Sequence, residues 1–95
     1  FDAFVCANDQ LAAGAMKFAS ENGISIPGDI AIVGIDNTDM ASLLHPTLTS
    51  VDLKAEERGE IAAQLMLDRL ANPDRASKRI TVEPKLVIRE STAKK

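Results

Sequence analysis

Two short apolar runs with a helical pattern between them open the chain. The first run extends from Ala3 to Ala7, and the second, Ile30–Ile35, contains no polar side chain. The first run has the pattern of a buried strand. The second is apolar on both faces, which is typical of a parallel strand covered by helices on each side. Between them, apolar residues recur at helical spacing from Leu11 to Ala19. This order predicts a strand, a helix and a second, parallel strand, joined by a right-handed crossover.

Capping residues mark both ends of this first helix. Asn8 and Asp9 are of the types that favour the N-cap, and Asn22-Gly23 suits a C-cap because glycine accepts the left-handed conformation. Asp9 is therefore interpreted chiefly as a helix cap. Asn8 is about equally suited to capping and to contact with a ligand.

Beyond the second strand, the pattern predicts one long helix between shorter elements. Met40–Leu44 can form a helical turn, and Leu48–Val51 a short extended segment. Lys54–Leu70 carries an apolar stripe at helical spacing and is ended by the proline that follows it. The end of the chain, Arg79–Arg89, alternates loosely and is interrupted by Pro84, which predicts two short strands at an edge.

Composition places the chain among ordinary globular proteins. Its 95 residues suit one small domain, with 45% hydrophobic and 26% charged residues and a net charge of −3. Acidity argues against DNA binding by this segment itself. Residues 71–95 carry seven bases against three acids, and we interpret them as a solvated end because no duplex-reading motif accompanies them. No apolar run approaches the roughly 20 residues of a membrane helix, so no membrane contact is expected.

Polar residues follow both predicted parallel strands. Asn8 comes after the first strand, and Asp36 follows the second without a convincing helix to cap. In open parallel sheets, ligands bind outside the carboxyl ends of the strands. Amide and carboxylate groups together suit a polar, hydroxyl-bearing small molecule. Four polar residues lie at this rim, namely Asn8, Asp9, Asp36 and Asn37. Among them, ligand contact is favoured for Asp36, is balanced against capping for Asn8, and is disfavoured for Asp9.

Catalytic and metal sites find little support in the sequence. His45 is the only histidine, and a nucleophile–histidine pair would have to use Ser42 or Cys6, the latter expected to be buried. One cysteine and one histidine do not provide a metal-ligand spacing. No phosphate-binding glycine loop occurs, and no cofactor is expected. A small hydrolase using His45 remains the weakest of the functional hypotheses.

Four segments, taken in order, resemble the LacI/GalR family of transcriptional regulators. Val5–Ala15 resembles the family's ANDxxAxGA segment, and Ile26–Asn37 its P.D...VGFDD stretch. Pro46–Leu70 is similar to the segment that begins P.LTTV, and Val82–Ser91 to the closing LVIRES. Any one motif is weak, but the four together cover nearly the whole chain.

The resemblance implies an α/β fold, as a parallel-sheet βαβ fragment of a type I periplasmic-binding-protein-like domain. It assigns residues 1–47 to the C-terminal lobe, 48–80 to a crossover strand and helix of the N-terminal lobe, and 81–95 to closing strands and a tail. It implies that Asn8 and Asp36 contact a small effector, often a sugar or a purine. It also implies a homodimer surface containing Ala13, Met16, Lys17, Leu43 and Leu44.

The same resemblance implies a cytoplasmic regulator rather than an enzyme, with operator DNA bound by a helix-turn-helix that is not in this chain. Two positions depart from the family pattern: Asn37 replaces the second Asp of the pair, and Lys54 stands where many members have Pro or a polar residue. The alternative is a periplasmic sugar-binding transport protein of the same fold.

Overall fold

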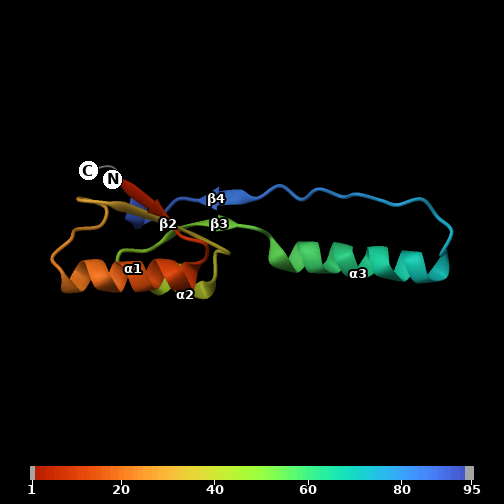
Figure 1. The fold of residues 1–95 in the computed structure, drawn as a ribbon, viewed down its shortest axis with the longest axis horizontal. Coiled ribbons are helices and arrows are strands. Elements are labelled where there is room, and N and C mark those ends of the chain that lie inside the picture. Colours follow the sequence, from red (N-terminus) through yellow and green to blue (C-terminus); the bar gives the residue numbers. More distant parts are fainter. Residues whose placement is uncertain (1, 94–95) are drawn as a thin grey trace.

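A single four-stranded sheet organises the chain. The computed structural model describes residues 2–93, so that Phe1 and the last two residues of the basic end, Lys94 and Lys95, lie outside it. The strands lie in chain order across the sheet, the first three parallel and the last antiparallel. They are β1 (Ala3–Val5), β2 (Ala31–Ile35), β3 (Thr49–Asp52) and β4 (Lys85–Val87) (Figure 1).

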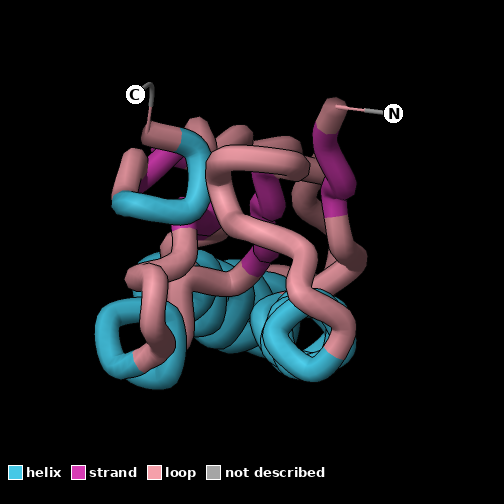
Figure 2. Tube along the Cα trace, turned by 90° about the vertical axis from the view of Figure 1, so that its left-hand side faces the viewer, coloured by secondary structure: helices cyan, strands magenta, loops and turns pink. Residues whose placement is uncertain are grey.

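The α-helices lie on one side of the strands (Figure 2). They are α1 (Asp9–Glu21), α2 (Asp39–Leu43) and α3 (Ala55–Ala71), and a short 3-10 helix, η1 (Glu90–Thr92), follows β4. The predicted strand, helix and parallel strand are thus confirmed, and the predicted long helix is correct to within one residue at each end. Gly23 has the left-handed conformation expected after the first helix, with φ +69°.

The hydrophobic core fills the space between α1, α2 and one face of the sheet. It consists of Ala12, Met16, Ile32, Ala41 and Leu48. The expectations that the first strand is buried and that the second is covered by helices on both faces were wrong. In β2 only alternate residues are buried, and β1 is exposed throughout because it forms an edge of the sheet and only one face receives helices.

α3 extends away from the sheet and gives the molecule its length of 59 Å (Figure 1). None of its residues is buried, and Met66, Leu67 and Leu70 are 60–69% exposed. Residues 72–84, here called the return segment, run back along α3 (Figure 1). Residues 79–84 form no strand there, so the first of the two predicted end strands was wrong. A neighbouring helix offers no partner for strand hydrogen bonds, since its own backbone groups are already paired.

The chain ends by closing onto the sheet. β4 pairs with β3 at the sheet edge, as predicted for the second end strand. The fully buried Ser91 hydroxyl donates to the Ile32 carbonyl (2.6 Å) and accepts from the Thr49 amide (2.8 Å). Residues 85–91 therefore complete the sheet by bonding to its two middle strands.

Candidate functional site

The ends of β1 and β2 meet at an open pocket, here called the rim pocket. Its volume is about 380 Å³, and its lining includes both predicted ligand contacts, Asn8 and Asp36. The other lining residues are Asp9, Gln10, Thr38, Asp39 and Met40. Asn8 and Asp36 follow different strands, and the parallel arrangement of those strands brings both residues to the same rim.

Asn8, rather than Asp9, caps α1. Its side-chain oxygen accepts a hydrogen bond from the Leu11 amide at 2.8 Å, which satisfies one of the free amides of the first turn. This leaves the Asn8 amide nitrogen as a donor at the rim pocket. Asn8 can therefore cap the helix and donate to a ligand at the same time.

Asp9 is a buried cross-link, which corrects its interpretation as a cap. Its side chain is 1% exposed and accepts three hydrogen bonds. One oxygen accepts from the Thr38 amide (2.7 Å) and hydroxyl (2.8 Å), and the other from the Ser50 hydroxyl (2.6 Å). These bonds join the start of α1 to the loop after β2 and to β3. The loop that carries Asp36 is thereby fixed to the core.

Gly34 provides the room that the Asp9 carboxylate needs. A Cβ at this position of β2 would collide with the Asp9 carboxylate and lie 2.9 Å from a Leu48 methyl group. A glycine within a buried strand commonly marks such a close approach. In the sequence, a glycine inside the apolar second strand was a signal of close approach, but it did not identify Asp9 as the neighbour.

Asp36 presents its carboxylate to solvent from an unusual backbone conformation. Its φ is +108°, and that of Asn37 is +49°, in the region that side chains other than glycine rarely adopt. Within residues 2–93, the Asp36 side chain makes no hydrogen bond. Only its amide is held, by the Val51 carbonyl at 2.8 Å. The carboxylate is thus free to accept hydrogen bonds from a ligand.

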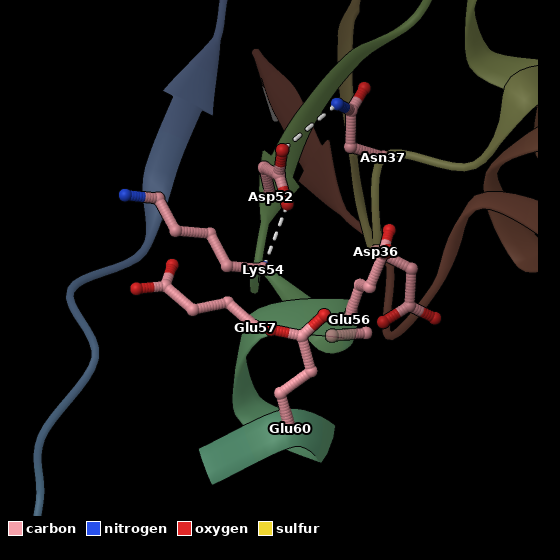
Figure 3. Close-up of a pocket in the computed structure, with 8 residues that line it drawn as sticks. Asp36, Asn37, Asp52, Lys54, Glu56, Glu57 and Glu60 are labelled. Atoms are coloured by element: carbon pink, nitrogen blue, oxygen red, sulfur yellow. Dashed lines mark hydrogen bonds between the residues drawn. The ribbon is translucent and has the colours of Figure 1, made fainter.

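A second, larger pocket adjoins the first at Asp36 (Figure 3). This acidic pocket has a volume of about 490 Å³ and is lined by Asp36, Asn37, Asp52, Lys54, Ala55, Glu56, Glu57 and Glu60. In Figure 3 the Asp36 carboxylate is turned away from Asp52, which bonds to Asn37 and Lys54 instead. Hydrogen bonds from the Lys54 amide and the Asn37 side chain lower the pKa of Asp52. Asp52 is therefore ionised at neutral pH.

The residues predicted at the dimer surface separate into two groups. Lys17 and Leu43 are exposed, and Ala13 is half-buried. Met16 was wrongly assigned, since it is 6% exposed and belongs to the core, and Leu44 packs half-buried against that core. Met16 lies on the stripe of α1 that faces the sheet, whereas Lys17 lies on its exposed side.

The catalytic alternative is not assembled. The Ser42 hydroxyl donates to the Asp39 carbonyl (2.9 Å), not to His45. Cys6 is only half-buried and follows β1, and desolvation raises the pKa of its thiol, which disfavours the reactive thiolate. Among the described residues, no group of three or more potential metal ligands occurs.

Comparison with known proteins identifies the family of this chain. The periplasmic binding protein-like domain family matches residues 2–92. The lactose operon repressor of Rhizobium radiobacter is 39% identical over 98% of this chain and 81% of its own length. The chain belongs to the LacI/GalR family. Within that family it has the fold of the effector-binding domain.

Two further relatives show how much of a regulator the chain represents. The HTH-type transcriptional repressor PurR of Proteus mirabilis is 41% identical over 96% of this chain and 27% of that repressor. A LacI family transcriptional regulator from Enterococcus faecium, solved with bound ribose, superposes with a TM-score of 0.89 at 35% identity, covering 97% and 34% of the two chains. This LacI/GalR chain is thus similar to about a quarter to a third of those proteins.

Both curated relatives named above are transcriptional repressors. None of the described helices has the length and apolar character needed to span a membrane.

Proposed function

We propose that this chain is the effector-sensing segment of a LacI/GalR-type DNA-binding regulator, and that Asn8 and Asp36 bind the effector. The observation that carries the proposal is the rim pocket, where a free amide donor and a free carboxylate come together from two strand ends. Donor and acceptor together match the hydroxyl groups of a sugar or the polar edge of a purine. The ribose-bound relative favours the sugar class.

The proposed mechanism is a change in domain closure. An effector that contacts Asn8 and Asp36 stabilises the closed arrangement of the domain more than the open one, and the equilibrium shifts by that difference in affinity. DNA-binding elements outside this chain respond to the change. Such a regulator acts in the cytoplasm, with operator DNA and a second copy as its partners.

Repressor relatives favour this function over a periplasmic sugar-binding transport protein, the alternative of the same fold. Both functions use the same pocket. DNA binding by the complete gene product separates them, because a transport protein does not bind duplex DNA.

The test replaces Asp36 with alanine in the complete gene product. Titration calorimetry with D-ribose should show a loss of affinity of at least about tenfold, because a charge-assisted hydrogen bond contributes about 1.5–3 kcal/mol. Affinity for a duplex selected by the protein from a random library should be unchanged. Asp74→Ala, in the exposed loop after α3, is the matched control. Unchanged ribose binding by the Asp36 variant would exclude Asp36 as the contact.

A further inference from the structure

A chain of hydrogen bonds connects the loop after β2 to the start of α3. Arg89 donates from its guanidinium to the Asn37 side-chain oxygen at 2.7 Å. The Asn37 nitrogen donates to one oxygen of Asp52 at 3.3 Å, and the other Asp52 oxygen accepts from the Lys54 amide at 2.7 Å (Figure 3). This path, called the Arg89–Lys54 relay, links three segments that are far apart in the sequence.

The relay is fixed to the core at its Arg89 end. The same guanidinium donates to the carbonyl of Leu48, a fully buried residue, at 2.8 Å. The Arg89 amide donates to the Thr49 hydroxyl, also at 2.8 Å. Arg89 is half-buried, and its planar fork of donors serves two acceptors at once. The position of the Arg89 side chain is therefore fixed by its bonds to the core and not by contact with solvent.

Asn37 holds the conformation that exposes Asp36. Both residues have left-handed φ values, which persist only where surrounding contacts maintain them. The Asn37 amide donates to the Ser50 hydroxyl at 2.9 Å, and that hydroxyl donates in turn to the buried Asp9 carboxylate. Main chain and side chain of Asn37 are thus both bonded, whereas the neighbouring Asp36 side chain is free.

The other end of the relay fixes the backbone at the start of α3. Lys54 is the N-cap residue of α3 and has φ +54°, a third left-handed position. The hydrogen bond from its amide to Asp52 defines this turn. A displacement of Asn37 would therefore move Asp52, and through it Lys54, where α3 begins.

We propose that Asn37 and Arg89 are positioning residues that hold Asp36 toward the effector and couple the rim pocket to the orientation of α3. This inference rests on the proposed function in taking Asp36 as the effector contact. It also accounts for Asn37, where the family pattern has a second Asp. An amide accepts from Arg89 and donates to Asp52, whereas a carboxylate would face Asp52 with a second negative charge.

The decisive measurements need no effector. In the complete gene product, carbon-13 NMR of the aspartate carboxyls and hydrogen exchange of single amides are compared between wild type, Asn37→Ala and Arg89→Lys. We expect the pKa of Asp52 to rise toward its ordinary value in Asn37→Ala, because a hydrogen bond to the ionised form is lost. The cations facing Asp52 are Lys54 and Lys85, and the other acids at its pocket are Asp36, Glu56, Glu57 and Glu60.

Hydrogen exchange distinguishes the relay from a general loss of stability. In both variants the Lys54 amide should exchange about tenfold faster relative to the Cys6 amide. The Cys6 amide is the reference because it donates to the Val33 carbonyl near the opposite edge of the sheet, where β1 pairs with β2. Equal acceleration of both amides, or an unchanged pKa of Asp52, would overturn the relay. Asn72→Ala and Arg79→Lys are matched controls, since neither side chain bonds to another described residue.

Asn37→Asp gives a signature that a merely structural role does not produce. With carboxyls at both positions 37 and 52, the pKa of one of them rises because two neighbouring negative charges repel each other. As the pH falls, that carboxyl takes up a proton and can donate a hydrogen bond to the other, which restores the contact that Asn37 makes with Asp52. We expect the D-ribose affinity of this variant to be about tenfold weak at pH 7 and to recover toward wild type at pH 5. Asn72→Asp should show no such recovery, and a pH-independent defect in Asn37→Asp would contradict the proposal.

Failure of the relay and failure of the proposed function give different results. A wild type that does not bind D-ribose argues against that effector, while the pKa of Asp52 and the Lys54 amide still decide the relay. A wild type that binds D-ribose with the same affinity as Asn37→Ala and Arg89→Lys leaves the pocket in place and removes the positioning role.

Discussion

A buried carboxylate is tolerated only when its oxygens accept enough hydrogen bonds to replace water, and Asp9 meets this condition with three donors. Two of them come from Thr38 and one from Ser50, so one side chain ties a helix start to a loop and a strand. Neither donor adjoins Asp9 in the sequence. The local pattern therefore predicted only a cap, and the cross-link required the folded structure.

Gly34 offers a direct test of this packing. Gly34→Ala places a methyl group against the Asp9 carboxylate and Leu48, and overpacking of this kind should lower the free energy of unfolding by about 1–3 kcal/mol. Urea unfolding followed by circular dichroism measures the change. Gly14→Ala, inside α1 with no atom within 4 Å of the added Cβ, should instead raise stability by about 0.5–1 kcal/mol. Equal effects at the two glycines would refute the close approach at Gly34.

At the scale of elements, local signals predicted most boundaries. The cap at Asn8 and the glycine at position 23 place the ends of α1, and the apolar stripe places α3. The prediction for Arg79–Glu83 was wrong because alternation alone does not supply a pairing partner. The exposure of β1 could not be predicted either, since it depends on which strand lies at the edge. Local patterns specify elements, whereas neighbours decide their burial.

η1 makes the stability of the chain sensitive to acid. Hydrogen bonds from the Thr47 amide (3.0 Å) and hydroxyl (3.1 Å), with a smaller effect from His45, lower the pKa of Glu90 below its ordinary value of 4.5. A lowered folded-state pKa contributes stability above pH 4.5 that is lost as the pH falls through the folded value. Thermal melts between pH 6 and 3 should therefore decline less steeply for Glu90→Gln than for wild type.

Glu83→Gln is the control for this pH dependence, because Glu83 is exposed and its side chain bonds to no other described residue. Its melting temperatures should follow those of wild type across the range. Parallel curves for wild type and Glu90→Gln would show that the contact with Thr47 does not contribute.

At the scale of the whole molecule, a compact sheet unit and a projecting helix differ in how well they are covered. The core lies under α1 and α2, whereas α3 has no buried residue. The family resemblance places the helix in another lobe, and that assignment stays a prediction. Periodicity alone could identify the apolar stripe of α3 but not the surface that covers it. The acidic pocket and the relay lie where these two parts meet.

The surface formed by Ala13, Lys17 and Leu43 is expected to mediate a homodimer. The family resemblance places Leu43 at the contact, and its side chain is 73% exposed and therefore available to a second copy. Leu43→Glu should weaken self-association of the complete gene product by about 2 kcal/mol, or roughly thirtyfold. Sedimentation equilibrium gives the dissociation constant. Ile80→Glu changes an exposed apolar residue outside this surface and should leave the dissociation constant unchanged. If neither substitution changes the dissociation constant, the interface lies elsewhere.

The closing contacts of Ser91 carry a consequence for how the protein is made. A ribosome adds residues in order, and the Ile32 carbonyl and Thr49 amide are synthesised long before the hydroxyl that bonds to both. Until Ser91 emerges, the Ile32 carbonyl and the Thr49 amide lack this partner, and until Val87 emerges β3 lacks β4. The nascent chain therefore holds an unfinished sheet edge, the kind of surface that chaperones bind. Premature stop codons shortly before Ser91 should yield proteins that are degraded rather than partly active regulators.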